Sequence, residues 1–144
     1  MMFCCEKLCA GINKKSAWIT SIVVFIFIFV SDFIIHGIFL KSAYEQTSHL
    51  WRTEQGMHDH FLWMLLAQFL IAKFFTLLYA RGCEQGGIKE ALRFACFIAP
   101  FAIAPYFIQY AVIPLPANIL WAWVGFGILQ IVGAAAVVGL VYKK

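Results

Sequence analysis

The sequence predicts an all-α integral membrane protein in which four transmembrane helices form an up-down bundle with both termini in the cytoplasm. Two features of the composition predict the membrane class: 63% of the 144 residues are hydrophobic and 12% are charged. Soluble domains have about 45–50% apolar and about 25% charged residues. The third feature is the division of the apolar residues into four long segments with polar borders.

The four apolar segments cover residues 17–40, 61–80, 88–113 and 118–142. Because a helix rises ~1.5 Å per residue, each segment is long enough to cross about 30 Å of hydrocarbon. The connections are short, which predicts that consecutive helices are antiparallel neighbours. Residues 1–144 are therefore predicted to form a single four-helix transmembrane domain.

The lysine and arginine residues predict the orientation. Only Lys41 and Arg52 lie in the first connection, and Lys73 lies within a span. The others flank the termini or the second connection: Lys7, Lys14, Lys15, Arg81, Lys89, Arg93, Lys143 and Lys144. Because cytoplasmic loops carry the excess of basic residues, we predict a bacterial inner-membrane protein with both termini and the second connection in the cytoplasm.

The first apolar segment contains two ionisable residues, Asp32 and His36, in the stretch SDFIIHG. Their spacing of four places both on one face of a helix. A charge at the centre of a membrane helix costs at least ~2.5 kcal/mol, so a partner for Asp32 is expected. Three candidates are His36 itself, Lys73 of the second segment and a bound cation.

All four histidines of the chain lie toward the predicted outer side. His49, His58 and His60, together with Asp32 and His36, form a candidate metal site, because imidazole and carboxylate groups suit zinc, copper or iron. The spacing Asp-x3-His-x12-His of Asp32, His36 and His49 is similar to that of copper ligands in a membrane subunit of the particulate methane monooxygenases. This resemblance covers three residues and implies copper as the metal to test.

A structural role fits the same residues. Asp32 and His36 can be a packed pair that fixes the register of the first helix. The stretch HDH can be a solvated helix start, in which Asp59 lies near the positive N-terminus of the second helix. Both interpretations remain open from the sequence.

The second and third segments contribute further polar side chains within the predicted membrane. Gln68, Lys73 and Gln109 are predicted to form an intramembrane polar layer at depths comparable to that of Asp32. Glutamines in spans usually form hydrogen bonds between helices, worth about 0.6 kcal/mol on average. For this reason the presence of these glutamines, and of Gln130 in the fourth segment, does little to favour one function over another.

Small residues in the last two segments predict close helix packing. They are Ala91, Ala95 and Ala99 of the third segment and Gly125, Gly127, Gly133 and Gly139 of the fourth. Pro100 and Pro105 interrupt the backbone hydrogen bonds of the third segment.

The chain contains no G-x-S-x-G or H-E-x-x-H motif, so an enzymatic function is not predicted. Its net charge of +4 is explained by basic flanks that face anionic lipid head groups, and nucleic-acid binding is not predicted. The sequence favours an accessory or structural subunit that packs in a larger membrane complex or a homo-oligomer within the lipid bilayer. One alternative is a metal-binding membrane protein with an outer-side site for copper or zinc. The other is a proton or ion path through Asp32, His36 and Lys73.

Overall fold

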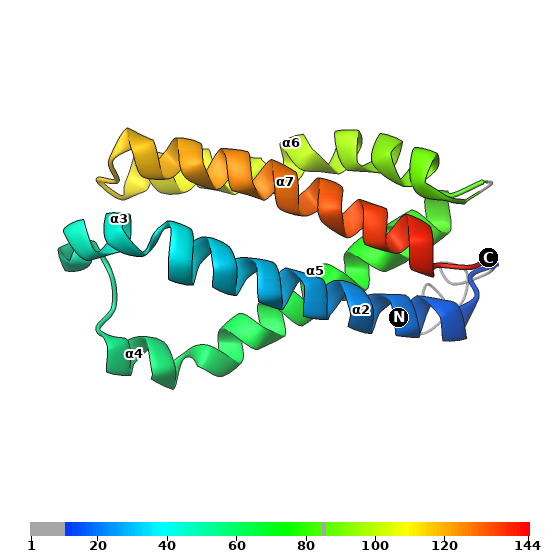
Figure 1. Cartoon of the computed structure of the whole chain (residues 1–144), viewed down its shortest axis with the longest axis horizontal. Coiled ribbons are helices and arrows are strands. Elements are labelled where there is room, and N and C mark those ends of the chain that lie inside the picture. The colour runs from blue at the N-terminus through cyan, green and yellow to red at the C-terminus, as the bar shows by residue number, and fades with distance from the viewer. Residues whose placement is uncertain (1–10, 85) are drawn as a thin grey trace.

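The computed structural model describes residues 11–84 and 86–144, and all of the regular elements in these residues are helical (Figure 1). Lys7, which contributes to the basic pattern, lies outside the described residues. The long helices are α2 (Lys14–Ile34), α5 (Phe61–Gly82), α6 (Ile88–Val112) and α7 (Ala117–Val141). At its end α2 continues into a π-helix, η1 (Ile35–Phe39).

Four helices of the described residues are long and apolar enough to cross a membrane, with α2 and η1 together forming one of 26 residues. This confirms the predicted all-helical class and the four membrane-length helices. The largest difference from the predicted segments lies at the start of the first, where the helix begins at Lys14 and not at residue 17. The side chain of Asn13 accepts a hydrogen bond from Ser16 N and thereby starts the helix before the apolar run.

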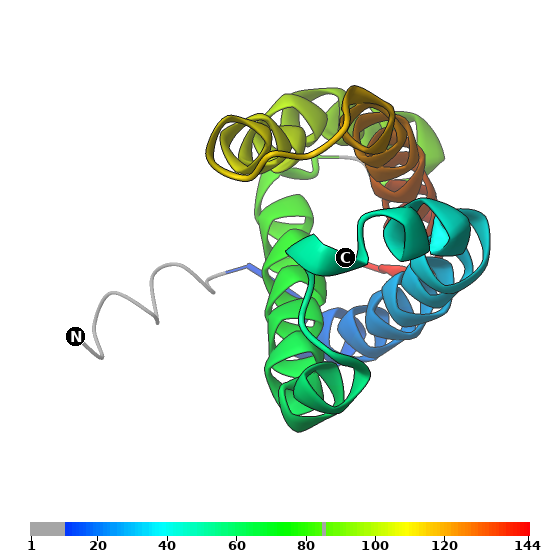
Figure 2. The same ribbon diagram turned by 90° about the vertical axis from the view of Figure 1, so that its left-hand side faces the viewer.

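The long helices pack in the spatial order α5, α2, α7 and α6. The contacts of α5 with α2 and of α6 with α7 join helices that the short connections predict to be neighbours. By contrast, α5 and α6 meet where the ring of Phe94 contacts those of Phe75 and Tyr79, with centroids 5.0 and 5.7 Å apart. Away from this region α5 diverges from α6 and α7 toward α4 (Figures 1 and 2).

The molecule has two different ends. The loop end carries three short helices, α3 (Lys41–Gln46), η2 (Ser48–Leu50) and α4 (Glu54–Asp59). The opposite, terminal end carries both ends of the described chain (Figure 1). There Lys143 N donates to Ser16 Oγ at 2.7 Å, and Lys144 Nζ donates to the carbonyl of Cys83 at 3.1 Å.

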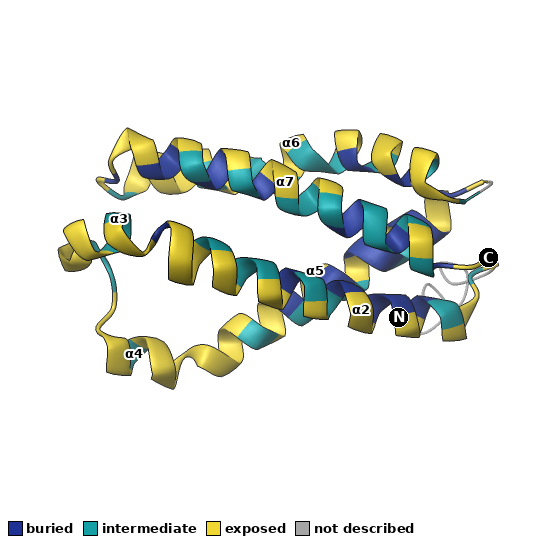
Figure 3. Cartoon of the chain, in the orientation of Figure 1, coloured by how far each residue is buried: buried dark blue, intermediate teal, exposed yellow. Residues whose placement is uncertain are grey.

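Two clusters of buried side chains hold the helices together. The terminal-half core joins residues of all four long helices, among them Val24, Ala72, Ala91 and Ala134. The loop-half core consists of Leu40, Leu115, Ile119 and Trp123. Among the described residues, α5 contributes nothing to the loop-half core, and its first seven residues are exposed or partly exposed (Figure 3).

The predicted close packing of the last two helices is confirmed at the terminal end. Ala91 and Ala95 are fully buried. A Cβ atom added to Gly139 would lie 2.8 Å from Ala91 Cβ and 3.0 Å from Ile88 Cα. Because backbone atoms cannot yield as a side chain can, the absence of a side chain at Gly139 permits this approach of α7 to α6.

Candidate functional site

The carboxylate of Asp32 is held by two glutamines from different helices. Gln68 of α5 donates from Nε2 to Asp32 Oδ2 at 2.5 Å. Gln130 of α7 donates from Nε2 to Asp32 Oδ1 at 2.6 Å and to Ser31 Oγ at 2.8 Å. Each carboxylate oxygen therefore accepts one amide N–H, and Asp32 links the three helices α2, α5 and α7.

The packing order of the helices explains why both glutamines reach Asp32. Helix α2 lies between α5 and α7, so a polar residue on its inner side meets side chains from both neighbours. Gln68 was predicted to share a polar layer with Asp32, and the structure brings the two together. Gln130 was not singled out, because nothing in a single sequence specifies that the first and fourth helices are neighbours.

Lys73, the other predicted member of the layer and a proposed partner of Asp32, lies elsewhere. Its Nζ stands 3.4 Å from the centre of the Trp18 ring, in a cation–π contact. Trp18 precedes Asp32 by 14 residues on the same helix, which corresponds to ~21 Å of helix rise. The ammonium group is thus far from the carboxylate. Gln109 is exposed on α6.

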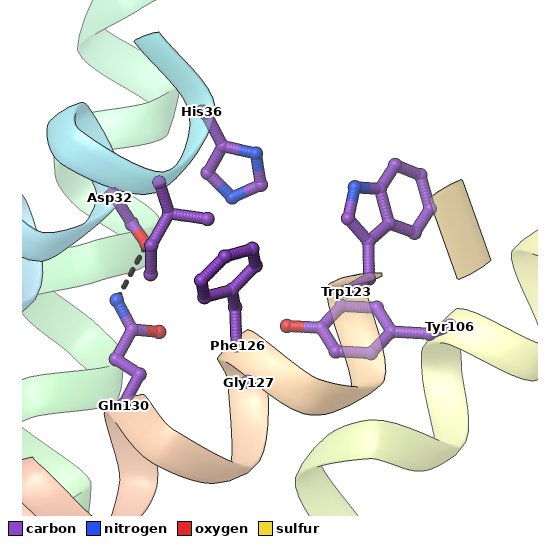
Figure 4. A pocket seen from close by; sticks show the side chains of 8 residues that line it. Asp32, His36, Tyr106, Trp123, Phe126, Gly127 and Gln130 are labelled. Carbon is purple, nitrogen blue, oxygen red and sulfur yellow. Dashed lines mark hydrogen bonds between the residues drawn. The ribbon is translucent and has the colours of Figure 1, made fainter. Parts of the chain in front are cut away.

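A small cavity adjoins Asp32, and we call it the Asp32 cavity (Figure 4). Its volume is about 10 Å³, which is room for about one water molecule. Polar and aromatic side chains, one aliphatic side chain and one glycine line it: Asp32, Ile35, His36, Tyr106, Trp123, Phe126, Gly127 and Gln130. A polar site of this size is suited to an ordered water or a small cation.

His36 belongs to a hydrogen-bonded chain at the loop end. Trp123 Nε1 donates to the hydroxyl of Tyr44 at 2.7 Å, and this hydroxyl lies 2.6 Å from His36 Nδ1. An indole N–H can only donate, so the Tyr44 oxygen accepts there and its own proton is available for His36 Nδ1. A neutral His36 then carries its proton on Nε2. Burial raises the pKa of Tyr44 to about 12, so the phenol keeps this proton at neutral pH.

The backbone around His36 is unusual. His36 lies in the π-helix η1, where Leu40 N donates to Ile35 O at 2.9 Å. π-Helical turns are rare, and many of them occur at functional sites, where the wider turn changes the direction of a side chain. Here the turn follows Asp32 directly.

A much larger opening lies on the other side of His36, and we call it the loop cleft. Its volume is about 890 Å³. Residues of α3, η2 and α4 form its walls together with Ile113, and His36 and Tyr44 also line it. His36 therefore borders both the loop cleft and the Asp32 cavity.

The three remaining histidines do not join this cavity. His60 Nδ1 lies 2.8 Å from Gly56 O, and His49 and His58 are exposed in η2 and α4. Within residues 11–84 and 86–144, no group of three or more His, Cys, Asp or Glu side chains is arranged to hold a metal ion. The structure brings together Asp32 and His36 of the five candidate ligands, and the metal site stays a prediction.

Several buried polar atoms have no hydrogen-bond partner in the described part of the chain. They include Gln68 Oε1, next to Asp32, and the hydroxyls of Thr20 and Thr76 in the terminal half. Gln68 is 5% exposed and both threonines are 0% exposed. A buried acceptor without a donor costs about 1–3 kcal/mol, so such atoms commonly bind water or ions.

No protein-family model, no curated protein and no solved structure matches this chain.

Proposed function

We propose that this chain is a small ion-handling membrane protein in which Asp32 binds a proton or a small cation that arrives from the loop end. The position of His36, which borders both the loop cleft and the Asp32 cavity, carries the proposal. Its imidazole stands between a wide opening and a carboxylate within a membrane helix. Histidine is the side chain best suited to relay protons near neutral pH.

The surroundings of Asp32 support reversible neutralisation of its charge. The two amides that bond the carboxylate are themselves neutral. A carboxamide that turns over presents its oxygen, so Gln68 and Gln130 can bond both the ionised and the protonated acid. The unpartnered Gln68 Oε1 is a further acceptor for a proton donor or a cation. Ionisable groups within membrane helices commonly mark such paths.

The route from Asp32 toward the terminal end is closed by apolar side chains of the terminal-half core, such as Val24 and Ile28. The unpartnered hydroxyl of Thr20 lies beyond them, ~18 Å from Asp32 along α2. Exchange of an ion with the loop end needs no rearrangement of this core. Passage across the whole membrane requires these apolar side chains to separate.

Infrared difference spectroscopy of the reconstituted protein between high and low pH tests proton binding. At low pH every carboxyl group contributes to the carbonyl band of protonated acids, and we expect Asp32 to add a separate component, shifted by its buried surroundings, that Asp32→Asn lacks while the rest of the band remains. The matched control is Asp59→Asn, which removes an exposed carboxylate at the loop end and should keep this component. The same bands in wild type and Asp32→Asn would contradict proton binding at Asp32. Repeating the titration with and without sodium tests whether a cation competes with the proton for this carboxylate.

Proteoliposome measurements separate a path from a one-sided binding site. A path predicts a flux that varies with pH and falls in Asp32→Asn. Equal flux in wild type and variant would remove the path, while the infrared result would still decide whether Asp32 binds a proton.

We further propose that the terminal end faces the cytoplasm of a bacterial inner membrane and that the loop end faces the opposite side. The basic residues support this orientation, because those of the described termini and of the α5–α6 connection share the terminal end. In a chain without native cysteines, an impermeant thiol reagent should label Ser48→Cys in intact cells. It should label Lys143→Cys only after permeabilisation, and the reverse result would invert the orientation.

A second candidate function is an accessory subunit of a homo-oligomer or larger membrane complex. The observation that favours it is Gln109, an exposed amide one turn before the end of α6, next to the exposed Tyr110. A neighbouring subunit would supply hydrogen-bond partners that lipid tails lack.

The oligomeric state in mild detergent, measured by native mass spectrometry, tests this second candidate. Gln109→Leu should raise the monomer fraction, whereas the matched control Ile108→Leu, a lipid-facing apolar exchange, should not. A monomeric wild-type protein that captures no membrane partner would contradict it.

A further inference from the structure

We propose that the loop cleft is a binding site for one phospholipid with a zwitterionic, amine-bearing head group. This inference is independent of ion binding at Asp32. It rests on the size of the cleft, on the charges along its rim and on the open flank of the molecule beside it.

The size of the cleft fits a ligand larger than an ion. Its volume of about 890 Å³ lies within the range of 300–1,000 Å³ that is typical of small-molecule sites. Apolar and aromatic side chains such as Leu50, Trp51 and Met57 form part of its lining. Tryptophan and tyrosine prefer the level of the lipid head groups, and Tyr44 and Trp51 place the cleft at that level.

The rim of the cleft carries charges of both signs. Lys41 and Glu45 form an exposed pair, with N···O 3.9 Å apart, and such pairs are weak. Arg52 and Glu54 also line the cleft, and neither forms an ion pair among the described residues. A guanidinium is well matched to a phosphate, and a carboxylate to an ammonium group. Two cations and two anions favour a zwitterionic head group over an anionic one.

The apolar flank between α5 and α6 favours a lipid over a water-soluble ligand, because it offers a surface for an acyl chain. In the loop half, the first seven residues of α5 are at most partly buried, and α6 exposes Ile108 and Val112. Away from their contact at Phe94, the two helices diverge (Figures 1 and 2). An acyl chain can therefore lie along this flank while its head group occupies the cleft.

The test is native mass spectrometry of the full chain released from nanodiscs of defined composition. We expect phosphatidylethanolamine to be retained in preference to phosphatidylcholine, whose methylated amine donates no hydrogen bonds, and to phosphatidylglycerol, which lacks the amine. Arg52→Gln should weaken this retention about tenfold, the loss expected for one charge-assisted hydrogen bond. Arg93→Gln, which removes an exposed arginine near the terminal end, is the matched control and should have no effect.

Three outcomes would overturn the proposal. The first is equal retention of the three lipids. The second is equal loss in Arg52→Gln and Arg93→Gln. The third is a dimer whose formation displaces lipid, because a second copy would then occupy the flank. Soluble glycerophosphoethanolamine, added as a competitor, should not displace the lipid if the acyl chain contributes to binding.

Discussion

At the scale of single residues, Asp32 is bonded by two neutral amides and not by Lys73, which the sequence offered as an ionic partner. Gln68 and Gln130 donate to its two oxygens, while Lys73 contacts Trp18. Hydrogen bonds to a charged group contribute about 1.5–3 kcal/mol each, more than those between neutral groups. The two amides therefore stabilise the ionised carboxylate without supplying a counter-charge, and in the proposed site a proton or a cation supplies it.

Gln130→Leu should lower the free energy of unfolding by about 1–2 kcal/mol, because it removes donors to Asp32 and Ser31. Unfolding in mixed detergent micelles measures the change. In an Asp32→Asn background the loss should be smaller, since the charged acceptor is gone. Gln109→Leu, at an exposed position, is the control and should leave monomer stability within about 0.5 kcal/mol. Equal effects at the two positions would show that the Asp32 contact contributes little.

The raised pKa of the Tyr44 phenol predicts that the free energy of unfolding falls at alkaline pH. Burial raises its pKa to about 12 in the folded state, whereas a free phenol titrates near about 10. Between these values the folded chain holds a proton that the unfolded chain has lost, so stability falls as pH rises through this window. Thermal unfolding at increasing pH should show a smaller fall in Tyr44→Phe than in wild type. Tyr110→Phe, at an exposed position, should behave as wild type, and identical curves for all three proteins would contradict this assignment.

At the scale of elements, the pairing of α6 with α7 depends on small residues at one end and on ring contacts at the other. Gly139 lies against Ala91 and the backbone at Ile88, whereas Gly127 lies against the ring of Tyr106. A methyl group added at Gly139 would therefore meet backbone atoms of α6, whereas one added at Gly127 would meet a ring. Gly125, by contrast, has open space around it.

Gly139→Ala should destabilise the protein by about 1–3 kcal/mol, because the new methyl group meets backbone atoms of α6. Gly125→Ala is the matched control, because no atom of another helix lies within 4 Å of the added Cβ. It should be neutral or stabilising by up to about 1 kcal/mol through helix propensity. Unfolding of the two variants side by side checks the prediction, and a stable Gly139→Ala would mean that α6 and α7 can separate without cost.

At the scale of the whole molecule, α5 and α6 close the series of helices only in the terminal half, where Phe94 contacts Phe75 and Tyr79. Helix α2 joins α5 to α7, and α7 joins α6. The loop-half core contains no described residue of α5. Near the middle of α5, Gln68 bonds Asp32 and the ring of Phe69 contacts that of Phe25, which links this helix to α2.

Crosslinking between α5 and α6 tests this arrangement. In a chain without native cysteines, a short bismaleimide should join Phe75→Cys to Phe94→Cys within one chain, because the native rings lie 5.0 Å apart. It should not join Trp63→Cys to Ile108→Cys, since the loop halves diverge. Intramolecular crosslinks at both levels would indicate a closed bundle and would also remove the flank that the lipid proposal requires.

Much of the architecture was predictable because hydrophobic length and polar borders are local properties. The helix ends lie close to the predicted ones, and Asn13 explains the early start of α2. That Asp32 and His36 lie close together was also predictable, because a spacing of four places both on one face of a helix; their role stays a prediction. Gln130 and Trp123 were missed, since each acts through a residue about 80 or more positions away in the sequence.

The sequence by itself determined four helices that are long and apolar enough to cross a membrane, with an acidic group inside the first one. Composition and segment length suffice for that, because a continuous apolar segment of this length satisfies its own backbone hydrogen bonds in hydrocarbon when it is helical. Only the tertiary structure decided which side chains meet Asp32, that His36 lines both a small cavity and a wide cleft, and that α5 and α6 diverge in the loop half (Figure 1). In lipid, apolar faces do not specify their neighbours, so the pairing of helices depends on shape and on a few hydrogen bonds between distant residues.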